Sequence, residues 1–232
     1  MSLADHRHSL APLGFLRVAI NLGNPVLAQG DATSPRGPSV ELATALAQRL
    51  GVQARFSCHD AAASVVAAAS DDAWDLAFLA ADPARADRIA FSTPYVEIEG
   101  TYLVRDDSPA QRVADLDRNG LRIAVGRGAA YDLFLGRELR HATIERAGTS
   151  AAAITLDAAA GVRQPLLAWA QAHPGHRVLA DRFTVIQQAV AAPIARPATA
   201  LQALFAEVQA IKAGPLLGEA FARAGQAVTL LR

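Results

Sequence analysis

The strongest constraint on the fold is the alternation of strand-like and helix-like segments along the chain. Residues 16–21 (LRVAIN) and 74–80 (WDLAFLA) are apolar runs of strand length, and residues 52–58 alternate like a strand. Apolar residues at helical spacing separate these segments, at 37–51 and 60–72. A strand, helix, strand, helix, strand order predicts a parallel sheet with helices on its faces.

A second set of such segments follows a polar, turn-rich stretch at residues 108–120. Strands are expected at 101–107, 121–126, 142–147, 155–161 and 176–180, and helices at 129–140 and 163–174. A long apolar segment at 183–194 then leads to two closing helices, at 197–214 and 215–225. The sequence therefore predicts two α/β units in tandem, joined near residues 103–107.

The closing helices have no strand partner of their own in the second unit, so the simplest packing places them on the first unit. This predicts one lobe from residues 1–103 plus 190–232 and another from residues 104–189. Each lobe is expected to be a mostly parallel sheet flanked by helices, with a ligand cleft between the lobes.

Composition excludes several classes of function. Lys and Arg number 22, as do Asp and Glu, so the net charge is zero and neither nucleic acid nor an acidic membrane is an expected partner. Cys58 is the single cysteine, which excludes an intrachain disulfide and a cysteine cluster. The six histidines lack metal-ligand spacing, so we predict no metal site and no cofactor.

The ends and apolar runs of the chain bear on its location. The first fifteen residues lack the apolar centre of a secretory signal, and no run of 18 residues is apolar enough to cross a bilayer. As given, the chain is expected in the cytoplasm without membrane insertion. If a signal peptide has been removed, the expectation is a periplasmic protein.

Five stretches in a fixed order carry a family resemblance: LRVAINLGNPVL, GPSVELATALAQRLGV, WDLAFLAADPARADRIAFSTPYVEIEGTYLV, LRIAVGRGAAYDLFL and LDAAAG. Together they resemble the bacterial extracellular solute-binding proteins of family 3, the receptors of polar amino-acid uptake transporters. The resemblance covers residues 16–225, and the block at 79–95 is its most specific part. It implies the type II periplasmic-binding-protein fold, in which two lobes close on a ligand.

The resemblance assigns a role to Arg85, in the loop after the third strand. In the family, the arginine of this loop binds the α-carboxylate of the ligand, and Ala80 and Asp82 lie beside it in the same block. A planar guanidinium donates two parallel hydrogen bonds to a carboxylate, which suits this role. The alternative from the residues alone is a surface arginine paired with Asp82.

Two further loops follow strands of the predicted sheets. Asn21 and Asn24 come after the first strand, where they either hydrogen-bond a ligand or cap a turn. Gly128, Ala129 and Ala130 open a helix, and backbone N–H groups at a helix start are able to hold an anion. A plain strand-to-helix turn is the alternative for this second loop.

One position departs from the family pattern. In the amino-acid receptors of the family, a carboxylate at the place of Val162 binds the ammonium group of the ligand. Here Arg163 and Gln164 follow Val162, and a second guanidinium facing the ligand favours a dicarboxylate or another anion. The alternatives are an Arg163 that points to solvent, and a replacement carboxylate supplied by Glu97 or Glu99.

The function expected from these residues is binding without catalysis. The chain is predicted to bind a small carboxylate-bearing solute, amino-acid-like or dicarboxylate, and an ABC transporter permease is a possible partner. The alternative is an enzyme on the same fold, similar to the cyclohexadienyl (prephenate or arogenate) dehydratases. That reaction needs a general acid with a raised pKa, and the candidates are Glu97, Glu99 and Asp132. No catalytic residue is predicted.

Overall fold

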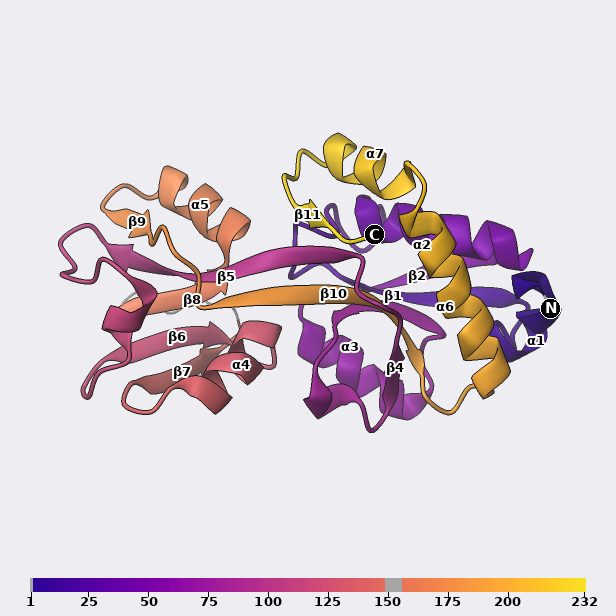
Figure 1. Ribbon diagram of the computed structural model, residues 1–232, viewed down its shortest axis with the longest axis horizontal. Helices are drawn as coiled ribbons and strands as arrows, with labels where there is room; N and C mark the ends of the chain where they lie inside the picture. The colour runs from indigo at the N-terminus through magenta and orange to yellow at the C-terminus, as the bar shows by residue number, and fades with distance from the viewer. Residues whose placement is uncertain (1, 149–155) are drawn as a thin grey trace. The chain divides into compact units, whose positions relative to one another are not determined.

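The chain forms two compact units, which a computed structural model describes for residues 2–148 and 156–232 (Figure 1). Unit 1 comprises Met1–Glu97 and Gln187–Arg232, and unit 2 comprises Ile98–Ile186. Strands β5 (Val96–Arg105) and β10 (Thr184–Pro193) contain the two boundaries between the units. Unit 2 is therefore an insertion into unit 1, entered along β5 and left along β10.

The sheet of unit 1 is built on three parallel strands in the order β2-β1-β3, followed by β10, which is antiparallel to β3. The strands are β1 (Phe15–Asn21), β2 (Gln53–His59), β3 (Leu76–Ala80), β4 (Ile89–Phe91), which pairs with β10, and β11 (Thr229–Leu230), which pairs with β5. Because β1 and β3 run in the same direction, the residues that follow Asn21 and Ala80 lie at one edge of the sheet.

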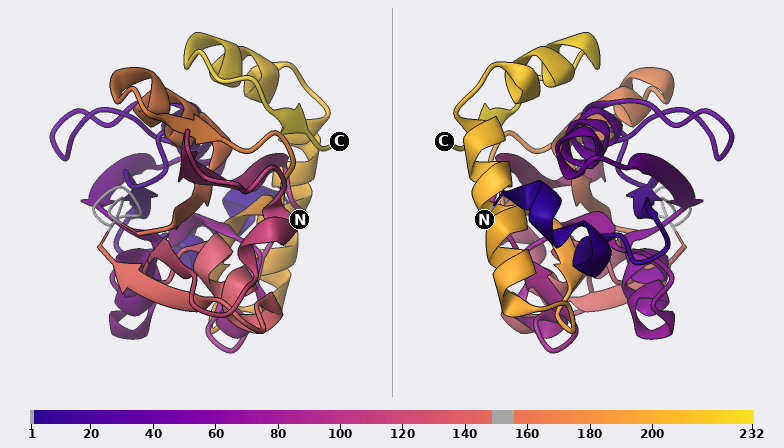
Figure 2. Two further views of the ribbon diagram at one scale, coloured as in Figure 1. Left: turned by 90° about the vertical axis from the view of Figure 1, so that its left-hand side faces the viewer. Right: turned by 90° about the vertical axis from the view of Figure 1, so that its right-hand side faces the viewer.

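Helices cover both faces of this sheet (Figure 1). They are η1 (Leu3–His6), α1 (Arg7–Leu10), α2 (Pro38–Leu50), α3 (Ala62–Ala68), η2 (Ala69–Asp71), η3 (Pro83–Arg85), α6 (Ala198–Lys212) and α7 (Leu216–Arg223), where η marks 3-10 helices. Val65 of α3 packs with Ala77 and Leu79 on one face, and α2 lies on the other face. Figure 2 shows α6 along the side of unit 1, next to the N-terminal helix η1.

The ends of α2 follow the signals in the sequence. Pro38 occupies the first helical position, where its missing N–H is not needed. Gly51 ends the helix with φ of 76°, a left-handed conformation, and donates its N–H to the carbonyl of Ala47. The predicted helix at 37–51 is thus confirmed.

Unit 2 has a sheet in the order β5-β8-β6-β7, with β9 also paired to β5. Its further elements are η4 (Val113–Leu116), β6 (Arg122–Gly126), α4 (Ala130–Glu138), β7 (Thr143–Ala147), β8 (Ala158–Val162), α5 (Arg163–Ala172) and β9 (His176–Val178). β6 is parallel to both β7 and β8, so the three strands end at the same edge of this sheet. Their last residues are Gly126, Ala147 and Val162.

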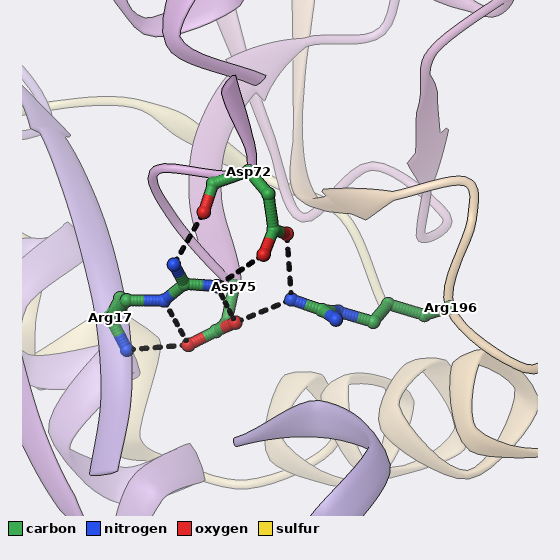
Figure 3. A network of polar contacts seen from close by, with 4 residues as sticks. All are labelled: Arg17, Asp72, Asp75 and Arg196. Carbon is green, nitrogen blue, oxygen red and sulfur yellow. Dashed lines mark hydrogen bonds and ion pairs between the residues drawn. The ribbon is translucent and has the colours of Figure 1, made fainter. Parts of the chain in front are cut away.

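Four charged residues of unit 1 form a network near the start of β1 and β3, at the edge opposite to the one where these strands end (Figure 3). The buried carboxylate of Asp75 accepts hydrogen bonds from the guanidinium groups of Arg17, at 2.7 and 3.0 Å, and Arg196, at 2.6 Å. Asp72 bridges the same two arginines. The network joins β1, the start of β3 and the segment before α6. A buried carboxylate with two arginine partners avoids the free-energy cost of an unpaired charge.

Some sequence expectations are corrected. The strand expected at 101–107 begins earlier, at Val96, and ends at Arg105. The strand expected at 155–161 is observed as Ala158–Val162, and residue 155 lies outside the described residues. Trp74 is buried, and Trp169 is partly buried, packs against a core cluster that contains Leu166, and stacks on the ring of His173, with 3.9 Å between centroids.

Candidate functional site

Arg85 is buried, with 4% of its surface exposed. It ends η3, directly after β3, and its Nη1 donates to the carbonyl oxygen of Ala80 at 2.9 Å. Burial lowers the pKa of the guanidinium, and the nearby charge of Asp82 opposes this effect. An exposed surface arginine, the alternative from sequence, does not fit this burial.

Asp82 begins η3 and is 8% exposed. Its Oδ1 accepts the backbone N–H of Ala84 at 2.9 Å, which is the ordinary N-cap contact. Ala80, Asp82 and Arg85 therefore form one local cluster where β3 ends.

The two asparagines of the first loop differ in their contacts. Asn21, at the end of β1, accepts the N–H of Gly23 through Oδ1 at 3.0 Å, so it caps the turn. Asn24 is 9% exposed, and its Oδ1 is buried without a hydrogen-bond partner among the residues that the structure describes. Both residues follow β1, the direct neighbour of β3 in the sheet. Asn24 is thus the residue of this loop with an acceptor still to satisfy.

In unit 2, the loop from Gly126 to Ala130 connects β6 to α4. Gly128 adopts φ of 69°, a left-handed conformation that favours glycine, and Ala129 is the N-cap. The N–H of Gly128 donates to Oδ2 of Asp132 at 2.8 Å, and the N–H of Ala129 donates to the carbonyl of Gly126 at 3.1 Å. Two of the backbone donors expected for an anion thus have contacts within the loop and α4.

Arg163 opens α5 after β8, and its guanidinium is held within unit 2. Nε donates to Glu99 at 2.5 Å, and Nη1 and Nη2 donate to the carbonyls of Leu179, Ala180 and Asp181 at 3.0, 3.1 and 2.9 Å. The side chain is 21% exposed, so the expectation that it points to solvent does not describe it. Gln164 follows in the first turn of the same helix.

The acidic residues considered as general acids are engaged in other contacts. Arg163 and Arg182 both contact Glu99, and although burial raises the pKa of Glu99, these two arginines outweigh it and lower the pKa overall. Glu97 accepts a hydrogen bond from Gln187 at 3.1 Å, and Asp132 contacts Arg146 at 2.8 Å. A general acid needs a raised pKa, so Glu99 lacks this property.

The structure brings the predicted residues together in two sets, one within each unit. Unit 1 holds Ala80, Asp82 and Arg85 at the end of β3, with Asn21 and Asn24 after the adjacent β1. Unit 2 holds Gly128, Ala129 and Ala130 after β6, and Arg163 and Gln164 after the adjacent β8. Among the described residues, no group of three or more His, Cys, Asp and Glu side chains is arranged to hold a metal ion. None of the described helices has the length and apolar character needed to cross a membrane.

Sequence reasoning missed the contacts made by Arg146 and Arg182. Arg146 contacts Asp132, which lies 14 residues earlier in the sequence, and Arg182 contacts Glu99, which lies 83 residues earlier. An acidic residue in the first turn of a helix is a usable signal for Asp132, because such residues often accept N–H groups before the helix. No local signal marks the pair of Arg182 and Glu99.

The family model for "Bacterial extracellular solute-binding proteins, family 3" matches residues 16–221. The chain belongs to this family. The expected fold and the expected role of a solute-binding protein rather than an enzyme are thereby confirmed. The comparison with curated protein sequences gives no match.

Solved structures of other solute-binding proteins share the fold. The solute receptor for L-cysteine of Neisseria gonorrhoeae has a TM-score of 0.79 at 22% identity, covering 97% of this chain and 93% of that chain. An amino acid ABC transporter substrate-binding protein from Streptococcus pneumoniae, bound to L-arginine, has a TM-score of 0.77 at 21% identity, covering 94% and 97%. An ancestral amino acid-binding protein, a precursor of cyclohexadienyl dehydratase, has a TM-score of 0.75 at 21% identity, covering 94% and 97%. These structures are type II periplasmic binding proteins, the fold expected for this solute-binding chain.

Proposed function

We propose that the chain is the substrate-binding component of an ABC transporter and that it binds a small, amino-acid-like carboxylate through Arg85. The observation that carries the proposal is the burial of Arg85 at the end of β3, where ligands bind in open α/β sheets. The membership of the family and the amino-acid ligands of the similar structures support it. The partner would be the membrane-spanning part of the transporter, which places the working protein outside the cytoplasm.

The position of the guanidinium supports recognition of a carboxylate. Nη1 is fixed by the carbonyl of Ala80, which sets the plane of the guanidinium. A fixed planar donor gives two parallel hydrogen bonds to a carboxylate and loses little conformational entropy on binding. Because Arg85 is 4% exposed, a bound carboxylate meets it away from bulk water, where the interaction is stronger.

An amino group of the ligand needs a negatively charged partner near Arg85. Glu99 is already contacted by two arginines, which makes it a poor partner for an ammonium group. Asp82 lies beside Arg85, and a ligand with adjacent carboxylate and ammonium groups would match this pair of opposite charges. The buried Oδ1 of Asn24, on the neighbouring loop, supplies a further acceptor.

Arg163, in unit 2, is a second candidate for binding an anionic group. Its contacts with Glu99 and three carbonyls give it a structural role in unit 2, so we place it after Arg85. Within unit 1, a site with Arg85 and Asp82 would favour an amino acid. The loop of Gly128, Ala129 and Ala130 ranks after both arginines, because the N–H groups of Gly128 and Ala129 already donate to Asp132 and Gly126.

Calorimetry with L-cysteine, L-arginine, L-glutamate and succinate tests the proposal. We expect at least one of them to bind, and we expect Arg85→Ala to weaken that binding by a factor of about 100, since it removes a charge-assisted pair of hydrogen bonds. Arg88→Ala is the matched control, because Arg88 is exposed three residues further along and contacts Asp87. Unchanged affinity in Arg85→Ala would remove Arg85 from the site.

A further inference from the structure

The loop after β1 contains a buried amide oxygen that lacks a hydrogen-bond donor. Asn24 is 9% exposed, and among residues 2–148 and 156–232 its Oδ1 has no partner. Buried polar groups in native proteins are nearly always paired, so an exception needs an explanation. A ligand that supplies the missing donor is such an explanation.

The turn itself does not require this amide. The N–H of Asn24 donates to the carbonyl of Asn21 at 3.4 Å. The carbonyl of Asn24 accepts the N–H groups of Leu27 and Ala28 at 3.0 and 3.1 Å. The side-chain cap of the turn comes from Asn21, through its contact with the N–H of Gly23. Main-chain groups and Asn21 therefore form the turn, and an apolar side chain at Asn24 would avoid the cost of burying an unpaired oxygen.

Asn24 and Arg85 are anchored at neighbouring strand ends within unit 1. β1 ends at Asn21, which Asn24 contacts through its N–H, and β3 ends at Ala80, whose carbonyl accepts Nη1 of Arg85. The two strands are parallel and adjacent, and their register places these ends within one residue of the same level. Neighbouring strands lie about 5 Å apart, a distance that a ligand of amino-acid size spans.

An amino acid carries the two groups that these side chains would bind. Its carboxylate matches the guanidinium of Arg85, and its amino group, attached to the adjacent carbon, donates N–H bonds to an acceptor such as Oδ1 of Asn24. Asp82, 8% exposed in the same short helix as Arg85, adds a negative charge that favours a protonated amino group. An acid without the amino group leaves the oxygen of Asn24 unpaired, and binding sites reject such analogues strongly.

We propose that Asn24 is a specificity-determining residue of unit 1. Its Oδ1 accepts an N–H of the amino group of the ligand, so the site selects amino acids over the matching acids that lack this group. This role rests on the proposed function, because it requires Arg85 to hold the carboxylate of the ligand. The choice between two classes of carboxylate is thereby assigned to one side chain.

Three substitutions separate the oxygen of Asn24 from the space that it fills. Asn24→Leu keeps a side chain of similar size and removes the acceptor. Asn24→Asp keeps an acceptor and adds a charge. Asn24→Ala is measured with them, so that the comparison stands if the leucine variant does not fold.

Two controls match these changes in chemistry and in place. Asn119→Leu makes the same change at an exposed asparagine of unit 2. Gln29→Ala removes the hydrogen bonds from Nε2 to the carbonyls of Pro25 and Ala224, both at 3.2 Å, and so loosens the loop of Asn24 without altering its amide. Neither control should change the selectivity for the amino group.

Calorimetry on the full chain, with variants shown by urea unfolding to be folded, compares three pairs of ligands: L-cysteine with 3-mercaptopropionate, L-glutamate with glutarate, and L-arginine with 5-guanidinopentanoate. The members of each pair differ only in the amino group. For at least one pair, the wild type is expected to bind the amino acid about a hundredfold more tightly than its counterpart. Asn24→Leu and Asn24→Ala should reduce this ratio about tenfold, since they remove one acceptor and leave Asp82, whereas Asn24→Asp should keep it. A merely structural role of Asn24 would lower the unfolding midpoint and weaken both members of a pair alike.

The outcomes distinguish this role from the function on which it rests. Amino-acid binding that is lost in Arg85→Ala, with an unchanged ratio in Asn24→Leu, would overturn the role of Asn24 alone. Equal affinity of the wild type for both members of each pair would do the same, as would a ratio that falls as far in Gln29→Ala as in Asn24→Leu. If no compound of the three pairs binds, the proposed function and the role of Asn24 both fail. A fall confined to Asn24→Leu and Asn24→Ala would support the inference.

Discussion

At the scale of single residues, Lys212 couples the stability of unit 1 to pH. It lies in the last turn of α6, is 6% exposed, and donates to Oγ1 of Thr93 at 3.1 Å. Burial lowers the pKa of its amino group below the ordinary value. Between the folded and unfolded pKa values the unfolded chain binds more protons, so stability rises as pH increases through that range.

We therefore expect Lys212→Met to be more stable than the wild type at pH 7, where the wild type has to bury a charge. This advantage should shrink as the pH approaches 10.5, because the native lysine then loses its proton. Urea unfolding at pH 7, 9 and 10.5 measures the difference. Lys212→Arg is the control, since its charge does not titrate in this range, and a constant difference between Lys212→Met and the wild type would contradict the expectation.

At the scale of elements, Asp117 joins the segment after η4 to the turn between α4 and β7. Its carboxylate accepts the backbone N–H groups of Arg140, His141 and Ala142 at 2.8 to 3.2 Å. Burial raises the pKa of Asp117, but these hydrogen bonds outweigh it, and the pKa lies below its ordinary value. The stabilisation is therefore present above the unfolded pKa and is lost as pH falls through the folded one.

Asp117→Ala is expected to lower the unfolding free energy by about 1–3 kcal/mol at pH 7, because it leaves backbone donors of this turn without their acceptor. The loss should become smaller only as the pH falls below 3.8 and through the lowered pKa of the folded state, where the wild-type carboxylate takes up its proton. Urea unfolding at pH 7 and at a series of values from about 4 down to about 2 measures the loss. Asp106→Ala serves as a control at an exposed acid of the same unit, and an equal loss at every pH would show that the carboxylate charge is not the cause.

The elements also show how far the sequence predicts this structure. The apolar runs at β1 and β3 are predictable because their burial follows directly from composition. The first half of β5 was missed because Glu97 and Glu99 interrupt the apolar run, although the buried Val96 and Ile98 alternate with them as in a strand. The stacking of Trp169 on His173 is a contact that hydrophobicity alone does not indicate.

The residues of the candidate site also differ in how far the sequence predicts them. Arg85 is predictable from a local motif, since the strand, the loop and the arginine are continuous in sequence. The partners of Arg163 are not, because Glu99 lies 64 residues away on β5 and meets it only through the antiparallel pairing of β5 and β8. Contacts of this kind depend on register, which a single sequence leaves open.

At the scale of the whole molecule, unit 2 is an insertion in the chain of unit 1, which is interrupted after Glu97 and resumes at Gln187. Tyr95 donates its N–H to the carbonyl of Gln188 at 2.9 Å, and the side chain of Gln187 donates to Glu97 at 3.1 Å. The residues on either side of the insertion are therefore neighbours within unit 1.

We expect that joining Glu97 to Gln187 through Asn-Gly gives a folded unit 1, since this dipeptide forms the two-residue hairpin turn that antiparallel neighbours need. The core around Trp74 lies within unit 1 and stays intact, and Trp74 becomes the single tryptophan of the shortened chain. Cooperative urea unfolding followed by its fluorescence, together with a native circular dichroism spectrum, measures the result. Unfolding without a cooperative transition would show that unit 1 depends on unit 2 for its stability. A matched version carrying Asp75→Ala should then unfold at a lower urea concentration, because it leaves Arg17 and Arg196 without their buried carboxylate.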